Sequence, residues 1–181
     1  MKRIAAVVLG FAAMSAGAFA QDQAAIDKAL LALPANLRKD ATVIKWKADY
    51  TYDTLKQGTS NLVCYDKSGM PLNGAFSVEC TDKGNLPRQA QSLKAEALGD
   101  RAKVNAELNK EEADGTRIKP VYGSVWYHLR GADADHTNTH LTIAVPGATK
   151  ATTGLPEDNK SGGVWIMQAG TSTAHLMTPG E

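Results

Sequence analysis

The sequence predicts an α+β fold, in which an antiparallel β-sheet carries one or two helices packed on one side. Segments with apolar residues at helical spacing occur alongside segments in which apolar and polar residues alternate one by one. Strand-like segments in neighbouring pairs, separated by turn residues, favour antiparallel pairing. The chain has 181 residues, and the 161 that follow a predicted signal peptide over 1–20 have the length of one domain, 21–181.

The signal peptide is predicted from the order of residue types at the N-terminus. Lys2 and Arg3 precede an apolar run from Ile4 to Met14, and Ala18-Phe19-Ala20 supplies the small residues of a cleavage site. A short N-terminal anchor is the alternative. The apolar run is shorter than the roughly 20 residues of a membrane span, so we expect no span after cleavage. The pattern therefore predicts export from a bacterial cell, to the periplasm or the medium.

Two helices and three strands are expected in the first part of the domain. Residues 21–33 place apolar side chains on one helical stripe that Pro34 ends, and residues 42–49 alternate like a half-buried strand. Residues 61–65 and 76–81 are strand-like and flank turn residues, which predicts a hairpin. The longest helical pattern covers residues 85–114.

The remainder of the chain is predicted to be strands. Residues 121–130, 139–145 and 163–169 are rich in β-branched and aromatic side chains and are separated by loops. The last of these is largely apolar on both faces, so we expect it in the centre of the sheet, covered on both sides.

Composition and charge exclude several classes of protein. Hydrophobic residues make up 43% of the chain and charged residues 22%, which is unlike a disordered protein. The 20 basic side chains against 19 acidic ones become 18 against 19 once Lys2 and Arg3 are removed with the signal peptide. With no surplus of positive charge, no nucleic-acid partner is expected.

Cys64 and Cys80 are the only cysteines, and they lie near facing positions of the predicted hairpin. Export places them in an oxidising compartment, where a single pair predicts a disulfide. Free or metal-binding thiols are the alternative. Closing a separation of 16 residues would stabilise the fold by about 3 kcal/mol in the chain-entropy model.

Histidines are the leading candidates for chemistry. His128 and His140 lie on the two strands that flank the loop 131–138. If the aliphatic faces of both strands contact one core, strand alternation puts both histidines on the opposite face, with Trp126 beside them. That face could line a cleft.

Three interpretations of the histidines remain open. His128 and His140, with His136 and Asp135 from the loop and His175 from the C-terminal segment, could bind a transition metal or another small ligand. His140 or His175 could instead be the general base of a small hydrolase. In the third interpretation the histidines only complete hydrogen bonds in a sheet.

Two tryptophans are candidates for an aromatic wall of the cleft. Trp126 and Trp165 lie in strand-like segments, where aromatic side chains either belong to the core or form a platform for a ligand.

Several motifs resemble a family of secreted bacterial proteins that has no assigned function. The resemblance is carried by Leu55…Gly58…Asn61…Cys64, by Cys80, by Thr139-His140-Leu141, and by the C-terminal block Val164-Trp165-Ile166-Met167-Gln168-Ala169-Gly170-Thr171…Ala174-His175-Leu176-Met177. It implies that Cys64, Cys80, His140 and His175 are matching positions, and it implies no reaction.

The sequence therefore predicts an exported, single-domain, non-enzymatic protein that binds a small ligand or a metal. No cofactor is obligatory, although a transition metal is possible, and the oligomeric state stays open. A secreted hydrolase and a structural or envelope-interaction module are the alternative functions.

Overall fold

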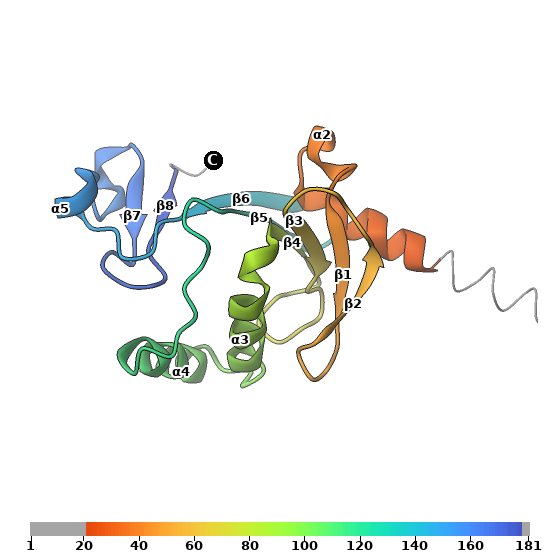
Figure 1. The fold of residues 1–181 in the computed structure, drawn as a ribbon, viewed down its shortest axis with the longest axis horizontal. Coiled ribbons are helices and arrows are strands. Elements are labelled where there is room, and N and C mark those ends of the chain that lie inside the picture. Colours follow the sequence, from red (N-terminus) through yellow and green to blue (C-terminus); the bar gives the residue numbers. More distant parts are fainter. Residues whose placement is uncertain (1–20, 179–181) are drawn as a thin grey trace, which may run out of the picture.

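The computed structural model describes residues 21–178, and the predicted signal peptide lies outside this range. Residues 21–29 are helical and continue into a short 3-10 turn. Figure 1 labels the main elements along the chain. Their bounds are η1 (Leu30–Ala32), α2 (Ala35–Arg38), β1 (Thr42–Trp46), β2 (Tyr52–Lys56), β3 (Leu62–Asp66), β4 (Phe76–Asp82), η2 (Lys83–Asn85), α3 (Leu86–Glu96), α4 (Arg101–Ala113), β5 (Val125–Gly131), β6 (Thr137–Ala144), α5 (Lys150–Thr153), η3 (Asn159–Ser161), β7 (Trp165–Met167) and β8 (His175–Met177).

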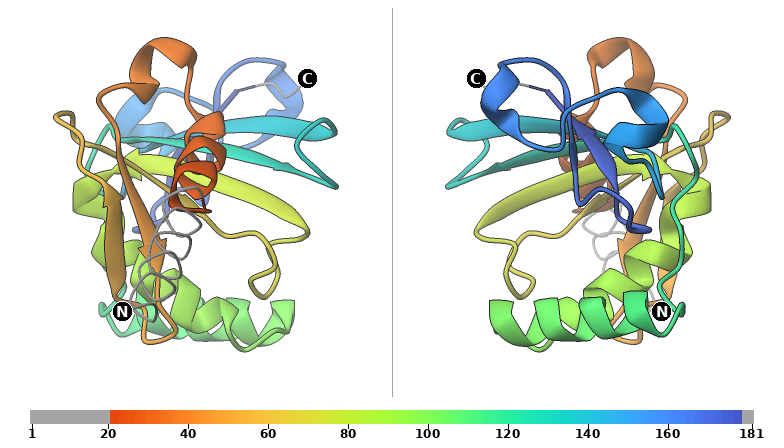
Figure 2. Two further views of the ribbon diagram at one scale, coloured as in Figure 1. Left: turned by 90° about the vertical axis from the view of Figure 1, so that its right-hand side faces the viewer. Right: turned by 90° about the vertical axis from the view of Figure 1, so that its left-hand side faces the viewer.

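The strands form one sheet in the order β2-β1-β3-β4-β5-β6-β8-β7, and the predicted α+β class is confirmed. All neighbouring strands are antiparallel except β1 and β3, which are parallel. Helices lie on both faces of the sheet rather than on one: residues 21–33 pack on one face and α3 on the other (Figure 2). No helix within residues 21–178 is both long and apolar enough to cross a membrane.

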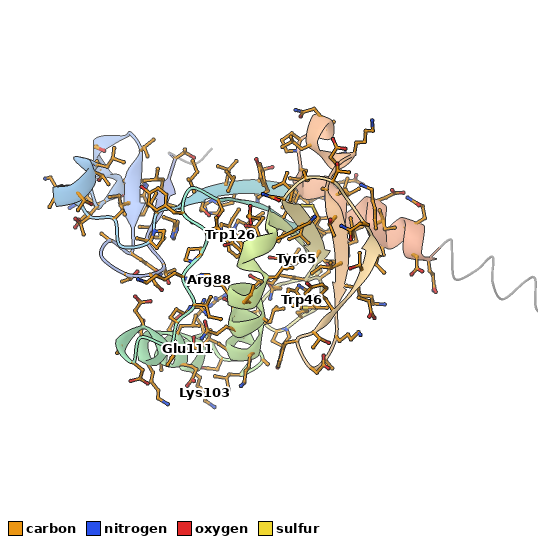
Figure 3. The ribbon with its side chains drawn as sticks, in the orientation of Figure 1. Trp46, Tyr65, Arg88, Lys103, Glu111 and Trp126 are labelled. Atoms are coloured by element: carbon orange, nitrogen blue, oxygen red, sulfur yellow. A yellow bond between two sulfur atoms is a disulfide. The ribbon has the colours of Figure 1, made fainter. Side chains whose placement is uncertain are left out.

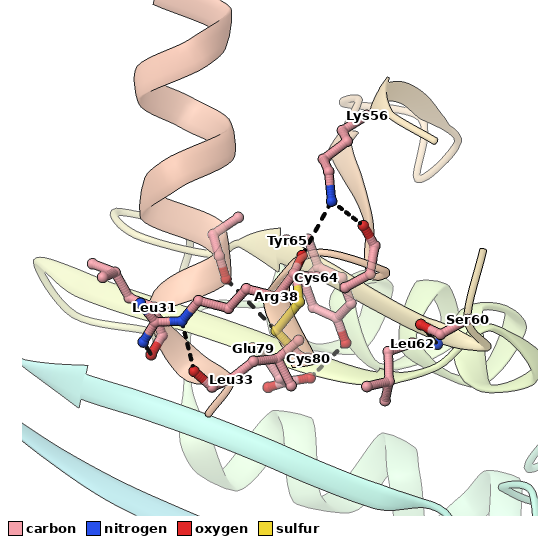
Figure 4. The surroundings of a disulfide bond; sticks show 12 residues. Leu31, Leu33, Arg38, Lys56, Ser60, Leu62, Cys64, Tyr65, Glu79 and Cys80 are labelled. Atoms are coloured by element: carbon pink, nitrogen blue, oxygen red, sulfur yellow. Dashed lines mark hydrogen bonds between the residues drawn. A yellow bond between two sulfur atoms is a disulfide. The ribbon is translucent and has the colours of Figure 1, made fainter. Parts of the chain in front are cut away.

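The disulfide lies on the face that residues 21–33 cover. Cys64 of β3 and Cys80 of β4 are directly opposite in the register, fully buried and bonded to each other (Figure 4). Alternation along β4 places Phe76 and Val78 on the same face as Cys80, in one core with Leu33. The predicted disulfide is therefore present, and it joins the two strands beneath the N-terminal helix.

The single helix predicted over residues 85–114 is wrong, because the segment forms two helices. Gly99 separates α3 from α4 in a left-handed conformation with φ of +69°, which glycine adopts without steric cost. Asp100 then caps α4 by accepting a hydrogen bond from the Lys103 backbone N–H at 3.0 Å. The break lets the polar α4 leave the sheet while α3 stays against it.

The central position predicted for the strand at residues 163–169 is also wrong. Only Trp165–Met167 forms a strand, β7, and it lies at the edge of the sheet because β8 is inserted between β6 and β7. The apolar side chain of Ile166 is instead buried against Val145, Ala148 and Ala174. The apolar side chain of this segment is thus buried by residues of the neighbouring loops, and not by a central position in the sheet.

Removing the disulfide by Cys64→Ala with Cys80→Ala should lower the free energy of unfolding by about 2–5 kcal/mol, because the unfolded chain regains the entropy of an open loop. Urea denaturation of the wild type and the double variant measures this difference. A loss below about 1 kcal/mol would show that packing of residues 21–33 on the sheet holds the hairpin without the covalent bond.

Candidate functional site

The register of β3 to β6 aligns four polar side chains in one row across the sheet. Tyr65 is opposite Glu79, Glu79 is opposite His128, and His128 is opposite His140. Residues opposite each other in a sheet share a face, so this row lies on the face that α3 covers in part. The expected placement of His128 and His140 on one face is confirmed, and the structure puts them directly opposite each other, with their ring centroids 5.8 Å apart.

Trp126 belongs to the next row of the same face. It is opposite Thr142 of β6, and its indole is nearly parallel to the His128 ring, with 6.3 Å between centroids and 11° between planes. Trp126 is half-buried. It therefore provides a flat apolar wall beside the two histidines.

A cavity of about 260 Å³ lies between this face of the sheet, α3 and the C-terminal segment. Figure 3 shows Arg88 of α3 and Trp126 of β5 next to this space. Its volume is below the roughly 300–1,000 Å³ of pockets for drug-sized molecules, which suits a small ligand. The cavity is lined by Lys67, Glu79, Arg88, Gln89, Ser92, Glu96, Arg117, Pro120, Trp126, His128, Arg130, His140, Thr142, Ala144, Thr173, Ala174 and His175.

Glu79 forms the floor of the cavity and is only 2% exposed. The Tyr65 hydroxyl donates to its Oε1 at 2.6 Å, and Nδ1 of His128 lies 2.9 Å from its Oε2, although the ring is not oriented for a linear hydrogen bond. Burial alone would raise the pKa of Glu79, but the charges of Lys67 and His128 and the Tyr65 hydrogen bond hold it well below its usual range. Glu79 is therefore a buried carboxylate that stays ionised.

Lys67 is the buried partner of two carboxylates. Its Nζ lies 3.8 Å from Oε2 of Glu79 and 3.3 Å from Oε2 of Glu96, and the residue is 2% exposed. The side-chain amide of Gln89 completes the network in the orientation that satisfies both of its ends, with its oxygen accepting from Lys67 at 3.1 Å and its nitrogen donating to Glu79 at 3.2 Å. Both carboxylates that line the cavity are thus already engaged by one ammonium group.

Arg88 differs from Lys67 because it has no carboxylate at salt-bridge distance anywhere in the described range 21–178. Its guanidinium donates to Oγ1 of Thr173 at 2.7 Å, to Oγ of Ser172 at 3.5 Å and to the carbonyl of Ile118. Burial, with the nearby charge of Arg117, lowers the pKa of Arg88 to about 10. Arg88 therefore stays charged at neutral pH, 5% exposed and held mainly by neutral acceptors.

Arg117 also lines the cavity, and its positive charge, unlike that of Arg88, is paired with a carboxylate. It donates to Gln91 at 3.0 Å and to Ser92 at 2.7 Å, and it pairs with Glu111 at 3.4 Å. Burial lowers its pKa in spite of the nearby carboxylates. Of the two arginines, Arg117 therefore has a carboxylate partner, and Arg88 has none at salt-bridge distance within residues 21–178.

His175 is anchored by the residue that also binds Arg88. Its Nδ1 donates to the backbone carbonyl of Thr173 at 2.8 Å, which leaves Nε2 as a hydrogen-bond acceptor in the neutral ring. Burial lowers the pKa of His175 and outweighs this hydrogen bond. Burial, followed by the charges of His128, His175 and Arg130, also lowers the pKa of His140. Both rings are therefore neutral at neutral pH.

His140 and His175 lie toward different ends of the cavity. His175 is opposite Ala144, which is four residues beyond His140 on β6. At about 3.3 Å per residue the two rows are roughly 13 Å apart along the strand. Within residues 21–178, no group of three His, Cys, Asp or Glu side chains is placed to hold a metal ion.

Three of the predicted site residues lie outside the cavity lining. His136 and Asp135 are exposed in the loop between β5 and β6, where Nδ1 of His136 lies 2.8 Å from Asp133. Trp165 belongs to the row of Trp126, but it lies three strands away, or about 14 Å at 4.8 Å per strand. The structure thus brings together Trp126, His128, His140 and His175 only.

The sequence interpretation missed the charged side of the cavity. Glu79 is one residue before Cys80, so its inward position on the face opposite the disulfide follows from alternation along β4. On α3, the spacing of Arg88, Ser92 and Glu96 by four residues marks a polar stripe on one helix face. Both signals were in the sequence, but only the packed structure shows that they meet.

Comparison of the chain with protein-family models, with curated proteins and with solved structures returned no match. The resemblance to a family of secreted bacterial proteins stays a prediction, and the function must be argued from the site itself.

Replacing Glu79 with Gln should lower the free energy of unfolding by about 3–5 kcal/mol, because it leaves Lys67 buried with only part of its positive charge compensated. The stability that wild-type Glu79 contributes is complete above its unfolded-state pKa near 4.5 and is lost as the pH falls below that value. The variant should therefore lose less stability on acidification than the wild type, as measured by denaturant unfolding between pH 7 and pH 3.

The matched control is Glu107→Gln, at an exposed glutamate of α4. It should leave both the stability at neutral pH and its acid dependence close to wild type. Equal acid slopes in the wild type and Glu79→Gln would contradict the assigned role of the buried carboxylate.

Proposed function

We propose that the protein is an exported, non-enzymatic binding protein whose cavity takes a small anionic ligand. The observation that carries the proposal is Arg88, a buried cation on the cavity wall with no carboxylate partner within the described residues 21–178. An anionic group would supply charge-assisted hydrogen bonds that the protein itself does not provide there.

The charges around the cavity support the same conclusion. Four permanently cationic side chains line it, against only two carboxylates, and Lys67 already engages both carboxylates. The histidines with lowered pKa values add no negative charge, and protonation would make the cavity more positive. A ligand with negative charge therefore complements the site better than a neutral or cationic one. The four cations are Lys67, Arg88, Arg117 and Arg130.

A transition metal has less support than an anion. A stable site needs three or more protein ligands, and residues 21–178 contain no such group of side chains. The buried disulfide supports the proposed location in the periplasm or the medium, because such bonds persist in oxidising compartments.

Arg88→Gln should weaken the binding of small anions by about tenfold or more, because charge-assisted hydrogen bonds contribute roughly 1.5–3 kcal/mol each. Phosphate, sulfate, acetate and benzoate are suitable probes, with binding followed by calorimetry and by the increase in Tm at low ionic strength. At least one of them should stabilise the wild type, and the increase should be lost in the variant.

Arg101→Gln, at an exposed arginine of α4, is the control for a general loss of positive charge. The measured quantity is the increase in Tm on adding the anion rather than Tm itself, so a less stable variant remains informative. Anion binding that is equal in Arg88→Gln and Arg101→Gln would overturn the proposal.

Hydrolysis is the second candidate function, and the anchoring of His175 favours it. A donor bond from Nδ1 to a carbonyl leaves Nε2 unprotonated, as a general base requires. If the protein only binds its ligand, a panel of ester, amide and glycoside substrates should show no turnover above a His140→Ala, His175→Ala double variant. A rate that the double variant loses would replace binding with hydrolysis.

A further inference from the structure

The Arg88 end of the cavity offers a donor and an acceptor at neighbouring positions. Thr173 connects them: its Oγ1 accepts from Nη2 of Arg88 at 2.7 Å, and its carbonyl accepts from Nδ1 of His175 at 2.8 Å. Because both side chains contact one residue and both line the cavity, a single small ligand can reach both.

The guanidinium retains donors for a ligand. An arginine side chain has five N–H groups, and the hydrogen bonds of Arg88 to Thr173, Ser172 and Ile118 engage three of them. The remaining donors suit a carboxylate, which guanidinium groups bind with good geometry.

His175 has the opposite preference. With Nδ1 bonded to the Thr173 carbonyl, the neutral ring presents only the lone pair of Nε2. A lone pair repels a carboxylate oxygen but accepts a hydrogen bond from a hydroxyl group. A ligand that satisfies both side chains therefore needs an anionic group for Arg88 and, next to it, a hydroxyl group for His175.

Trp126 adds a third requirement further along the cavity. Its half-buried indole lies beside His128, between the row of His140 and the row of Ala144 and His175. An apolar or aromatic body attached to the hydroxyl-bearing carbon would lie against this wall.

We infer that the cavity recognises a small α-hydroxy acid with an apolar body, with its carboxylate on Arg88 and its hydroxyl group donating to Nε2 of His175. This inference rests on the proposed anion-binding function and specifies its ligand. Thr173 is the positioning residue that holds both recognition groups in place.

The test compares four probes by calorimetry. Mandelate carries all three features, phenylacetate lacks the hydroxyl group, mandelamide lacks the charge and lactate lacks the aromatic ring. Wild-type protein should bind mandelate about tenfold more tightly than phenylacetate, the size of one well-formed hydrogen bond. Mandelamide should bind at least tenfold more weakly than mandelate, and lactate should also bind more weakly than mandelate.

His175→Phe separates recognition of the hydroxyl group from a structural role. The variant should bind mandelate and phenylacetate with a ratio near one while its affinity for phenylacetate stays within about threefold of wild type. His136→Phe, at an exposed histidine outside the cavity, should keep the wild-type ratio. If His175→Phe does not fold, His175→Asn should lower the ratio, because the amide N–H can keep the hydrogen bond to the Thr173 carbonyl while the acceptor at the Nε2 position is lost.

The outcomes distinguish the inference from the function on which it rests. Equal binding of mandelate and phenylacetate, lost in Arg88→Gln, would overturn the hydroxy-acid inference and leave the anion-binding proposal standing. Equal binding of mandelate and mandelamide would overturn both. Absence of binding for all four probes would also overturn the inference, and the inorganic anions would then decide the proposed function.

Discussion

The ionised carboxylate of Glu79 is the group around which the polar side of the sheet is arranged. Its position in the centre of β4 buries it, and an isolated buried charge would cost several kcal/mol. Tyr65, Lys67 and His128 therefore all turn toward it, from β3, from the turn after β3 and from β5. Because His128 lies against Glu79, the ring of His140 on the next strand has a fixed neighbour. The geometry of the cavity floor follows from satisfying this one charge.

The two faces of β4 have separate roles. Cys80 and Val78 belong to the dry core under residues 21–33, where the disulfide ties β4 to β3. Glu79, between them in sequence, faces the cavity. The disulfide on one face of β3 and β4 thus fixes the two strands that carry polar residues of the cavity on their other face. A rigid backbone keeps the hydrogen-bonding groups of such a site in fixed positions.

Lys67 and Arg88, two of the four cationic groups of the cavity, differ in whether they are free to bind a ligand. Lys67 is balanced by Glu79 and Glu96 and belongs to the structure, whereas Arg88 is held by hydroxyl and carbonyl oxygens. Neutral acceptors position a guanidinium without cancelling its charge, so its field remains directed into the cavity. The neutral ring of His175 beside it adds an acceptor. This contrast between a cation in direct contact with carboxylates and one in direct contact with neutral oxygens only is what points to a ligand.

Properties that depend on neighbours along the chain or across one hairpin could be predicted from the amino-acid sequence. Alternation, turn residues and the single pair of cysteines were enough to predict the α+β class, the Cys64–Cys80 bond and the shared face of His128 and His140. It did not determine where Gly99 would break a helical pattern, or that β8 would insert between β6 and β7. The spacing of apolar residues within one segment does not show which distant segment will pair with a given edge of the sheet or pack on a given face. The meeting of Arg88, from a helix, with Thr173 and His175 of the C-terminal segment could not be predicted in this way, because it depends on how α3 packs against the sheet.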